Sequence, residues 1–331
     1  QQVAELLPRL LSHLSAETPE FAGVLLEIYM PLLVWLELGR VEVASVSIDH
    51  ADGSSGVYAL DAPSAEYQQS ADSGKSFSLD GRDARMLTET IAYLRPGAFS
   101  NTDPGADPLD AATFLDFVDS AFRNFLENDA AQLIVDLRDN PGGHNAFSDP
   151  IIAWFADRPF RFSSDFRVRV SPQSTAANQA RLDSGSAGTD SVSHLYAELY
   201  ASTEDGQTVS FPIPEVEPRS SPRFEGDVYL LVNRYSFSNA VSAAALIQDY
   251  GFGVVMGERT VDMATTYGAM ERFTLPNTEI VVAYPKALIV RPNGKETIHP
   301  VTPDVMLPAP RTRGASDVML EAAVQHIESE S

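Results

Sequence analysis

Two short segments of the sequence carry the residue types that acyl-transfer chemistry requires. The first, Tyr235-Ser-Phe-Ser-Asn-Ala240, presents Ser236 and Ser238 directly after an apolar run. A serine in such a place is most often a helix N-cap, whose hydroxyl accepts a hydrogen bond from the backbone two or three residues later. It can also expose a nucleophilic hydroxyl near a helix N-terminus, whose dipole favours developing negative charge.

The second segment, Asp136-Leu-Arg-Asp-Asn-Pro-Gly-Gly143, follows another apolar run. Its two glycines can turn the chain sharply and leave backbone N–H groups unpaired and pointing at a ligand. An oxyanion hole needs such a nest of amides. A tight turn between a strand and a helix explains the same glycines, so the segment alone leaves both interpretations open.

Strands and helices alternate around these segments. Residues 132–136 and 227–232 are short, apolar and β-branched, as strands buried on both faces should be. Helices are expected at 109–126 and 238–250, so we predict an α/β sheet. A hairpin is expected near 270–291, with Asn293-Gly294 as a two-residue turn of the primed type, and the Ser-, Ala-, Asp- and Pro-rich stretch 172–222 is predicted to be an inserted lid or substrate arch.

The N-terminal region predicts a helix that begins at Thr18-Pro19 and runs toward Gly39. Residues 21–38 are apolar nearly all round but are interrupted by Glu27, Pro31 and Glu37, so we expect a buried core helix and no membrane span. The sequence opens without Met, and we expect a signal peptide or a longer segment to precede Gln1.

Composition excludes several function classes. The formal net charge of −23 disfavours nucleic acid and anionic membranes as partners, because both would be repelled. The absence of cysteine excludes disulfides, thiolate catalysis and Cys-ligated metals. Of the 23 basic residues only Lys75, Lys286 and Lys295 are lysines, which limits the choice of a catalytic base. No metal or organic cofactor is expected.

Taken together, the segments resemble peptidase family S41, which includes the C-terminal-processing proteases, the tricorn core and the chlamydial protease activity factor. The first match is to the family's Asp-Leu-Arg-x-Asn-x-Gly-Gly signature at 136–143. The resemblance covers about 85–310 and is weaker before that. The further matches, in the family's order, are Arg223-Phe-x-Gly-Asp-Val-Tyr-Leu-Leu-Val-Asn233, Ser236-x-Ser238-x-Ala240, Gln248-Asp-Tyr-Gly251, Gly257-Glu-x-Thr260 and Pro303-Asp-Val305.

The resemblance implies roles for particular residues. It implies that Ser238 is the nucleophile, with Ser236 as the less favoured alternative, and that the oxyanion donors are the backbone N–H groups of Gly143, Gly142 and Asn239. In the histidine-using branches a late glutamate helps to orient the site, and Glu296 stands close to its place.

The general base is where this sequence departs from the processing proteases. Their lysine follows the nucleophile by 25 positions, where this chain has Met263, and we expect Lys286 and Lys295 to lie on a hairpin surface. The resemblance to the histidine-using branches then implies a histidine base. Their His-Thr pair does not occur here, so we expect the base upstream of Gln1. His144, beside the oxyanion glycines, and His299 remain alternatives.

The resemblance therefore implies a crotonase-like α/β core and serine endopeptidase activity through an acyl-enzyme on Ser238. We expect an N-terminal helical and β subdomain at 1–84, the catalytic core at 85–310 and a C-terminal helix at 311–331. The substrate would be a peptide or protein, a homo-oligomer is left open, and a bacterial periplasmic or secreted location is expected. A non-catalytic binding protein on the same scaffold is the main alternative, and an acyl-CoA enzyme of the crotonase type is a second.

Overall fold

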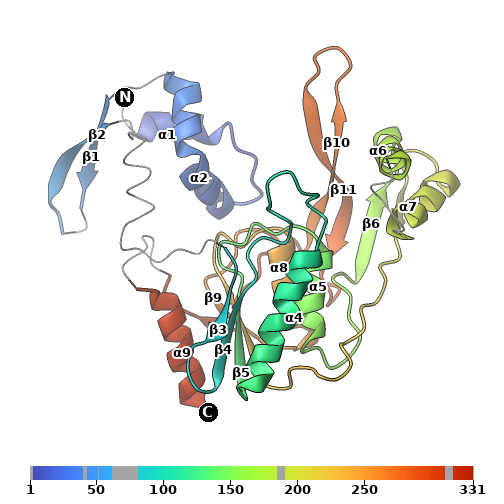
Figure 1. Ribbon diagram of the computed structural model, residues 1–331. Coiled ribbons are helices and arrows are strands. Elements are labelled where there is room, and N and C mark those ends of the chain that lie inside the picture. The colour runs from blue at the N-terminus through green and yellow to red at the C-terminus, as the bar shows by residue number, and fades with distance from the viewer. Residues whose placement is uncertain are drawn as a thin grey trace. The chain divides into compact units, whose positions relative to one another are not determined.

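The computed structural model describes residues 3–39, 43–50, 52–61, 81–184, 191–309 and 316–330 (Figure 1). The chain divides into two compact units, a smaller one of Gln1–Ser78 with Pro310–Val318 and a larger one of Leu79–Ala309 with Met319–Ser331. Both chemistry-bearing segments lie in the larger unit. The elements of the smaller unit are α1 (Val3–Leu11), α2 (Pro19–Leu38), β1 (Val43–Asp49) and β2 (Ser55–Asp61).

Helix α2 begins where the sequence predicts. Thr18 is its N-cap, the Thr18 hydroxyl accepts a hydrogen bond from the Phe21 amide at 3.2 Å, and Pro19 occupies the first turn. The prediction that α2 is a buried core helix is wrong. Most of its large apolar side chains face solvent, with Ile28 54% and Trp35 56% exposed. An apolar composition on all sides of a helix does not show whether protein or lipid covers it.

By length and composition α2 could also cross a membrane, and it is the only described helix that could. Despite the interruptions by Glu27, Pro31 and Glu37, the mean hydropathy of an 18-residue window is 1.7, and the expectation of no membrane span stays a prediction. Core helices of soluble proteins and signal sequences pass the same test, so this observation alone assigns no location.

A six-stranded sheet organises the larger unit, in the order β12-β9-β8-β5-β4-β3. Its neighbours pair in parallel except β3 and β4, which are antiparallel. The sequence-predicted strands 132–136 and 227–232 are confirmed as adjacent central strands. The strands of this sheet are β3 (Asp83–Met86), β4 (Ile91–Arg95), β5 (Gln132–Asp136), β8 (Asp227–Val232), β9 (Val254–Gly257) and β12 (Val305–Met306).

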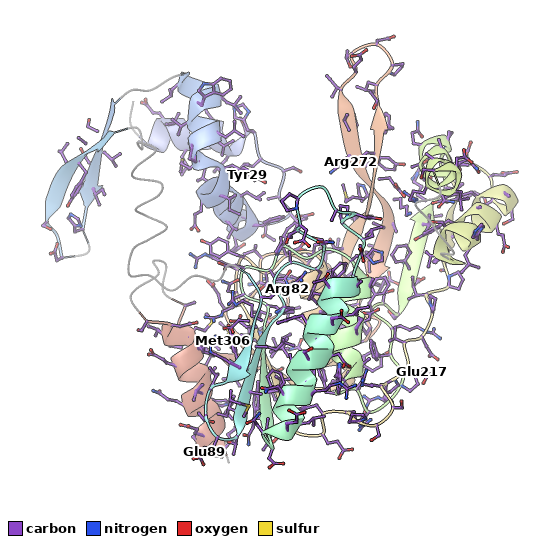
Figure 2. All side chains as sticks on the ribbon, in the orientation of Figure 1. Tyr29, Arg82, Glu89, Glu217, Arg272 and Met306 are labelled. Atoms are coloured by element: carbon purple, nitrogen blue, oxygen red, sulfur yellow. The ribbon has the colours of Figure 1, made fainter. Side chains whose placement is uncertain are left out.

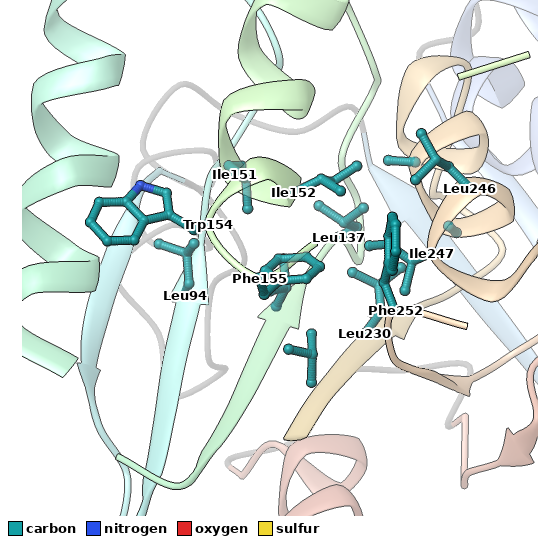
Figure 3. Packing of buried hydrophobic residues seen from close by; sticks show 14 of the residues in the cluster. Leu94, Leu137, Ile151, Ile152, Trp154, Phe155, Leu230, Leu246, Ile247 and Phe252 are labelled. Carbon is teal, nitrogen blue, oxygen red and sulfur yellow. The ribbon is translucent and has the colours of Figure 1, made fainter. Parts of the chain in front are cut away.

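Helices cover both faces of this sheet, which makes three layers (Figure 1). Side chains such as Leu94, Val135 and Leu230 point to the face covered by α4 (Ala112–Glu127), α5 (Asn145–Ala153) and α8 (Asn239–Tyr250) (Figure 3). The alternate side chains, including Ile134 and Leu231, pack on α9 (Val318–Glu330). Burial on both faces explains the continuously apolar strand sequences.

A second sheet, in the order β10-β11-β6-β7, carries a smaller core of its own with α6 and α7. The 172–222 stretch supplies α6, α7 and β7 to this subdomain, so it is a folded part of the unit. Its role as a lid or arch stays a prediction. The elements are β6 (Asp165–Arg169), α6 (Pro172–Asp183), α7 (Ser191–Ser202), β7 (Thr208–Ser210), β10 (Thr266–Thr274) and β11 (Val281–Val290).

Two sequence expectations fail in this subdomain. The β10–β11 hairpin exists but turns between Thr274 and Val281, and Asn293-Gly294 follows β11. Lys286 is 6% exposed and not a surface residue: its ammonium bonds Glu271 at 2.8 Å, which Arg181 also pairs at 2.7 Å. Burial lowers the pKa of Lys286 below its usual value, although the ion pair with Glu271 acts in the opposite direction and stabilises the buried charge.

Candidate active site

The two chemistry-bearing loops leave the same edge of the main sheet, because β5 and β8 are parallel neighbours with Asp136 opposite Leu231. Residues 137–144 follow β5, and residues 233–238 follow β8. The loops touch at Gly142. A Cβ placed there would lie 2.7 Å from the Cβ of Ser238, 2.7 Å from the Asn239 nitrogen and 2.6 Å from the Phe237 carbonyl oxygen.

Side-chain hydrogen bonds hold the two loops together. The Asn233 amide accepts from the Asp139 backbone N–H at 3.1 Å and donates to the Asp139 carboxylate at 2.7 Å. Ser236 is fully buried and its hydroxyl donates to the Leu137 carbonyl at 2.8 Å. Ser236 thus has a structural role, and its oxygen is turned away from any substrate.

Asn140 shapes the glycine turn. Its side chain donates to the Gly97 carbonyl at 2.8 Å and accepts from the Gly142 N–H at 2.8 Å, while its carbonyl accepts from the Phe237 N–H at 2.9 Å. The Gly142 amide is therefore occupied. The expectation that Gly142 donates to an oxyanion is wrong, since its contribution is the absence of a side chain at φ +83°.

Gly143 has a different constraint. A Cβ at this residue would lie 2.0 Å from the Phe99 carbonyl oxygen, and its φ is +138°. The neighbouring groups hold the turn to the 97–99 segment, since the Phe99 N–H donates to Gly142 at 2.9 Å and the His144 N–H donates to Phe99 at 2.8 Å. Within the described residues the Gly143 N–H has no acceptor, which leaves it open to a ligand.

A buried carboxylate anchors the start of this loop. Asp136 accepts from Arg138 at 2.6 Å, from Arg95 at 2.8 Å and from the Tyr93 hydroxyl at 2.7 Å. Burial would raise the pKa of Asp136, but the charges and hydrogen bonds of Arg138 and Arg95 outweigh it and keep that pKa below its usual value. Removing one partner of such a buried pair typically costs about 3–5 kcal/mol.

Ser238 lies at the start of α8 in a strained conformation, with φ 52° and ψ −122°. Its side chain is exposed and makes no capping hydrogen bond. A non-glycine residue in such a region costs about 1–3 kcal/mol and persists only where its surroundings hold it. Among the described residues nothing accepts from or donates to its hydroxyl, so the serine presents an unoccupied oxygen at a sharp turn.

Asp262 holds the backbone of Ser238. One carboxylate oxygen accepts from the Ser238 N–H at 2.5 Å and the other from the Met263 N–H at 2.8 Å. Asp262 is buried. The sequence does not predict this contact, because an acidic residue 24 positions after a serine carries no signal of it.

Asn239 follows Ser238 and is fixed through its side chain. Its amide donates to the Ser148 hydroxyl on α5 at 2.9 Å, and both residues are buried. Next to Ser148, burial raises the pKa of Asp149 to about 7. The backbone N–H of Asn239 has no acceptor among the described residues, so it and the Gly143 N–H are two open donors, on the residues that directly follow Ser238 and Gly142 in the chain.

The remaining sequence candidates are placed as follows. His144 is exposed and caps α5, its Nδ1 accepting from the Ala146 N–H at 3.1 Å. Glu296 is exposed and pairs with Arg167 at 2.6 Å, which lowers the pKa of Glu296. Neither hydrogen-bonds Ser238. The described residues hold no cluster of His, Asp and Glu that could bind a metal ion.

The core of the larger unit matches a known protein family. Residues 90–307 match the model of peptidase family S41. The chain belongs to this family. The matched region includes β5, β8 and both loops of the site. A comparison with curated protein sequences gave no match.

Solved structures support the fold of this S41 chain. Mature CPAF aligns with a TM-score of 0.57 at 15% identity, over 97% of this chain and 73% of CPAF. Mature CPAF complexed with lactacystin aligns with a TM-score of 0.54 at 15% identity, over 88% and 67%. A candidate peptidase from Parabacteroides merdae aligns with a TM-score of 0.51 at 16% identity, over 100% and 90%. These likenesses show a shared mixed α/β fold.

Replacing Gly142 by alanine tests whether the contact between the two loops is needed for activity, apart from any general loss of folding stability. Gly142→Ala should lower kcat/KM at least about 100-fold, because the methyl group must displace the Ser238 turn or the Asn239 amide. Gly251→Ala is the matched control: Gly251 also has positive φ, at the end of the same helix, but meets no atom within 4 Å. It should cost about 1–2 kcal/mol of stability and leave kcat/KM unchanged. Equal losses of activity in the two variants would contradict the proposed contact.

The strain at Ser238 predicts an order of stabilities between two variants of this residue. The free energy of unfolding of Ser238→Gly should be about 1 kcal/mol higher than that of Ser238→Ala, because glycine adopts the positive φ without strain. This gain should exceed the additional chain entropy that glycine loses on folding. Urea unfolding followed by circular dichroism measures the difference. An alanine variant as stable as the glycine variant would mean that residue 238 is not strained.

Substitutions of Asp262 should be graded by the number of acceptors that they remove. Asp262→Ala leaves two amides unpaired and should lose about 2–5 kcal/mol of unfolding free energy. Asp262→Asn keeps one acceptor oxygen and should lose about half as much. Urea unfolding tests the order, and an asparagine variant as unstable as the alanine variant would argue against the two-amide role.

Proposed function

We propose that this S41 chain is a serine endopeptidase that hydrolyses peptide bonds through an acyl-enzyme on Ser238. The observation that carries the proposal is the unoccupied Ser238 hydroxyl at a strained turn that packs against Gly142. The next residues in the chain, Asn239 and Gly143, have N–H groups with no acceptor among the described residues. A nucleophile needs an accessible oxygen, and its tetrahedral intermediate needs donors fixed in advance. Both are supported by the geometry of the two loops.

The reaction would proceed in two halves. The Ser238 oxygen attacks the peptide carbonyl carbon while a base removes the hydroxyl proton, and the carbonyl oxygen becomes an oxyanion held by the Gly143 and Asn239 amides. The intermediate then collapses, the C–N bond breaks, and the base returns the proton to the leaving amine. Water, activated by the same base, hydrolyses the ester and restores the serine.

We infer that the base is a histidine. The lysine of the processing proteases is replaced by Met263, which is buried. As expected from the sequence, we place the histidine in a segment that precedes Gln1. His144 is the less favoured candidate because its Nδ1 accepts the α5 capping hydrogen bond. Glu296 as the orienting carboxylate is not supported by its pairing with Arg167.

The wider proposals follow from family membership. We assign the larger unit a crotonase-like core, with catalysis in residues 85–310, and peptides or proteins as substrates. A periplasmic or secreted location stays a prediction. A homo-oligomer stays a prediction.

A non-catalytic binding protein is the second candidate, favoured by one observation. No described histidine or lysine hydrogen-bonds Ser238. Such a protein would bind peptides without cleaving them and would not react with an acylating or phosphonylating reagent. An acyl-CoA enzyme would turn over thioesters even after Ser238 is replaced.

Reaction with a fluorophosphonate tests the peptidase proposal. The Ser238 oxygen should displace fluoride at phosphorus, and mass spectrometry should find the adduct on the peptide that contains residue 238. The reaction rate should rise with pH to a plateau, and the midpoint of the rise should lie at about pH 6.5, because a histidine base must be neutral to accept the proton. A lysine base would move the midpoint upward.

Two variants control this experiment. Ser238→Ala should abolish labelling. Ser236→Ala should be labelled at the same site, although loss of its hydrogen bonds to Leu137 and Asn233 should cost about 1–3 kcal/mol of stability. Labelling that survives in Ser238→Ala, or its absence in the wild-type protein, would remove Ser238 as the nucleophile.

A further inference from the structure

A cavity of about 350 Å³ lies on the larger unit, at the far end of α8 from Ser238. Of its eight described lining residues, Arg259, Arg291 and Lys295 are cationic, and none is acidic. The whole chain has 46 acidic and 23 basic residues, so this lining reverses the overall balance. Charges of one sign that line a hollow focus the field there and concentrate ions of the opposite sign.

The cations of the cavity differ in how they are used. Arg291 is neutralised and held in place by Asp249, with hydrogen bonds of 2.6 and 2.9 Å. Arg259 and Lys295 are exposed, and no ion pair joins either of them to a described residue. Most other arginines of the larger unit pair with a carboxylate, as Arg167 does with Glu296. The cavity therefore gathers two positive charges that are available to a ligand.

Two carboxylates close to the lining residues in the sequence, Glu296 and Asp304, bond groups other than Arg259 and Lys295. Glu296 stands between Lys295 and Thr297 in the sequence, but its carboxylate pairs with Arg167 on β6. Asp304 accepts from the Gln248 side chain at 2.9 Å and from the Val255 N–H at 2.9 Å. Uncharged hydroxyls of Thr297 and Thr302 complete a lining that suits an oxygen-rich anion.

The wall of the cavity is connected by backbone pairing to the segment that holds the nucleophile. The Ala264 N–H donates to the His299 carbonyl at 2.9 Å, and Met263 bridges Pro300. Asp262, the next residue, accepts from the Ser238 N–H. A ligand in the cavity would thus contact residues 299–300, whose backbone pairs with the two residues that follow Asp262.

We propose that this cavity binds a small oxyanion through Arg259 and Lys295. The anion is either a carboxylate of a peptide substrate or a free anion such as phosphate. Only the first source rests on the proposed peptidase function. Both sources share the chemistry that two unpaired cations and neighbouring hydroxyl donors recognise.

Binding to Ser238→Ala tests the proposal without any turnover. Three probes are titrated at low ionic strength: inorganic phosphate, an acetylated peptide containing glutamate, and the same peptide with glutamine. Phosphate or the glutamate peptide should bind, and the additional substitutions Arg259→Gln and Lys295→Gln together should weaken that binding about tenfold or more. Arg272→Gln, which removes an exposed arginine of the β10–β11 hairpin (Figure 2), should change nothing.

The outcomes separate the two sources and the two proposals. Binding of phosphate alone identifies a free anion, and binding of the glutamate peptide but not the glutamine peptide identifies a substrate carboxylate. If neither probe binds, or if the double variant binds as well as its parent, the proposal is wrong. Both replaced side chains are exposed, so melting temperatures should be nearly unchanged; the two single substitutions give the same test if the double variant unfolds. Phosphate binding in a protein that fails to react with fluorophosphonate would leave this site standing and remove the peptidase proposal.

Discussion

The contact between Gly142 and the Ser238 turn is the constraint on which the site depends. The two backbones approach so closely that no side chain fits between them. Parallel pairing of β5 and β8 brings both loops to one edge of the sheet, but it does not fix their separation. That separation is set by the hydrogen bonds of Asn140 and of the Asp139–Asn233 pair, which hold the Gly142 turn against the Ser238 turn.

The strained backbone of Ser238 can persist because the core behind it cannot move. Helix α8 is buried from Asn239 to Ile247, and it packs on the sheet together with α5, which holds the Asn239 side chain through Ser148. On the opposite side Asp262 accepts the Ser238 N–H. A conformation that costs about 1–3 kcal/mol is thus kept by the packing of α8, by its hydrogen bond to α5 and by the hydrogen bond to Asp262. The hydroxyl is left free because the helix start is stabilised by other means.

The sequence predicted the strands and the loops of the site because both depend on local patterns. Residues 133–135 and 228–232 are apolar without interruption, which fits a strand buried on both faces, and glycines mark where the chain must turn. Contacts between distant segments left no such signal. Asp262 and the buried pair of Lys286 with Glu271 are polar residues whose partners are set by tertiary packing. The occupied Gly142 amide also depends on a side-chain rotamer of Asn140, which no spacing encodes.

In this acidic protein most of the described arginines form ion pairs with carboxylates of the same chain. Asp136 takes two of them at the start of the glycine loop, and Glu271 takes Arg181 together with Lys286 in the second sheet. Arginine suits these positions because its planar group makes several directed hydrogen bonds and stays charged when buried. An excess of carboxylates elsewhere then leaves little unpaired positive charge on the surface. Where two free cations do meet in one hollow, their field is opposed by few neighbours, and recognition of an anion is the function that this arrangement favours.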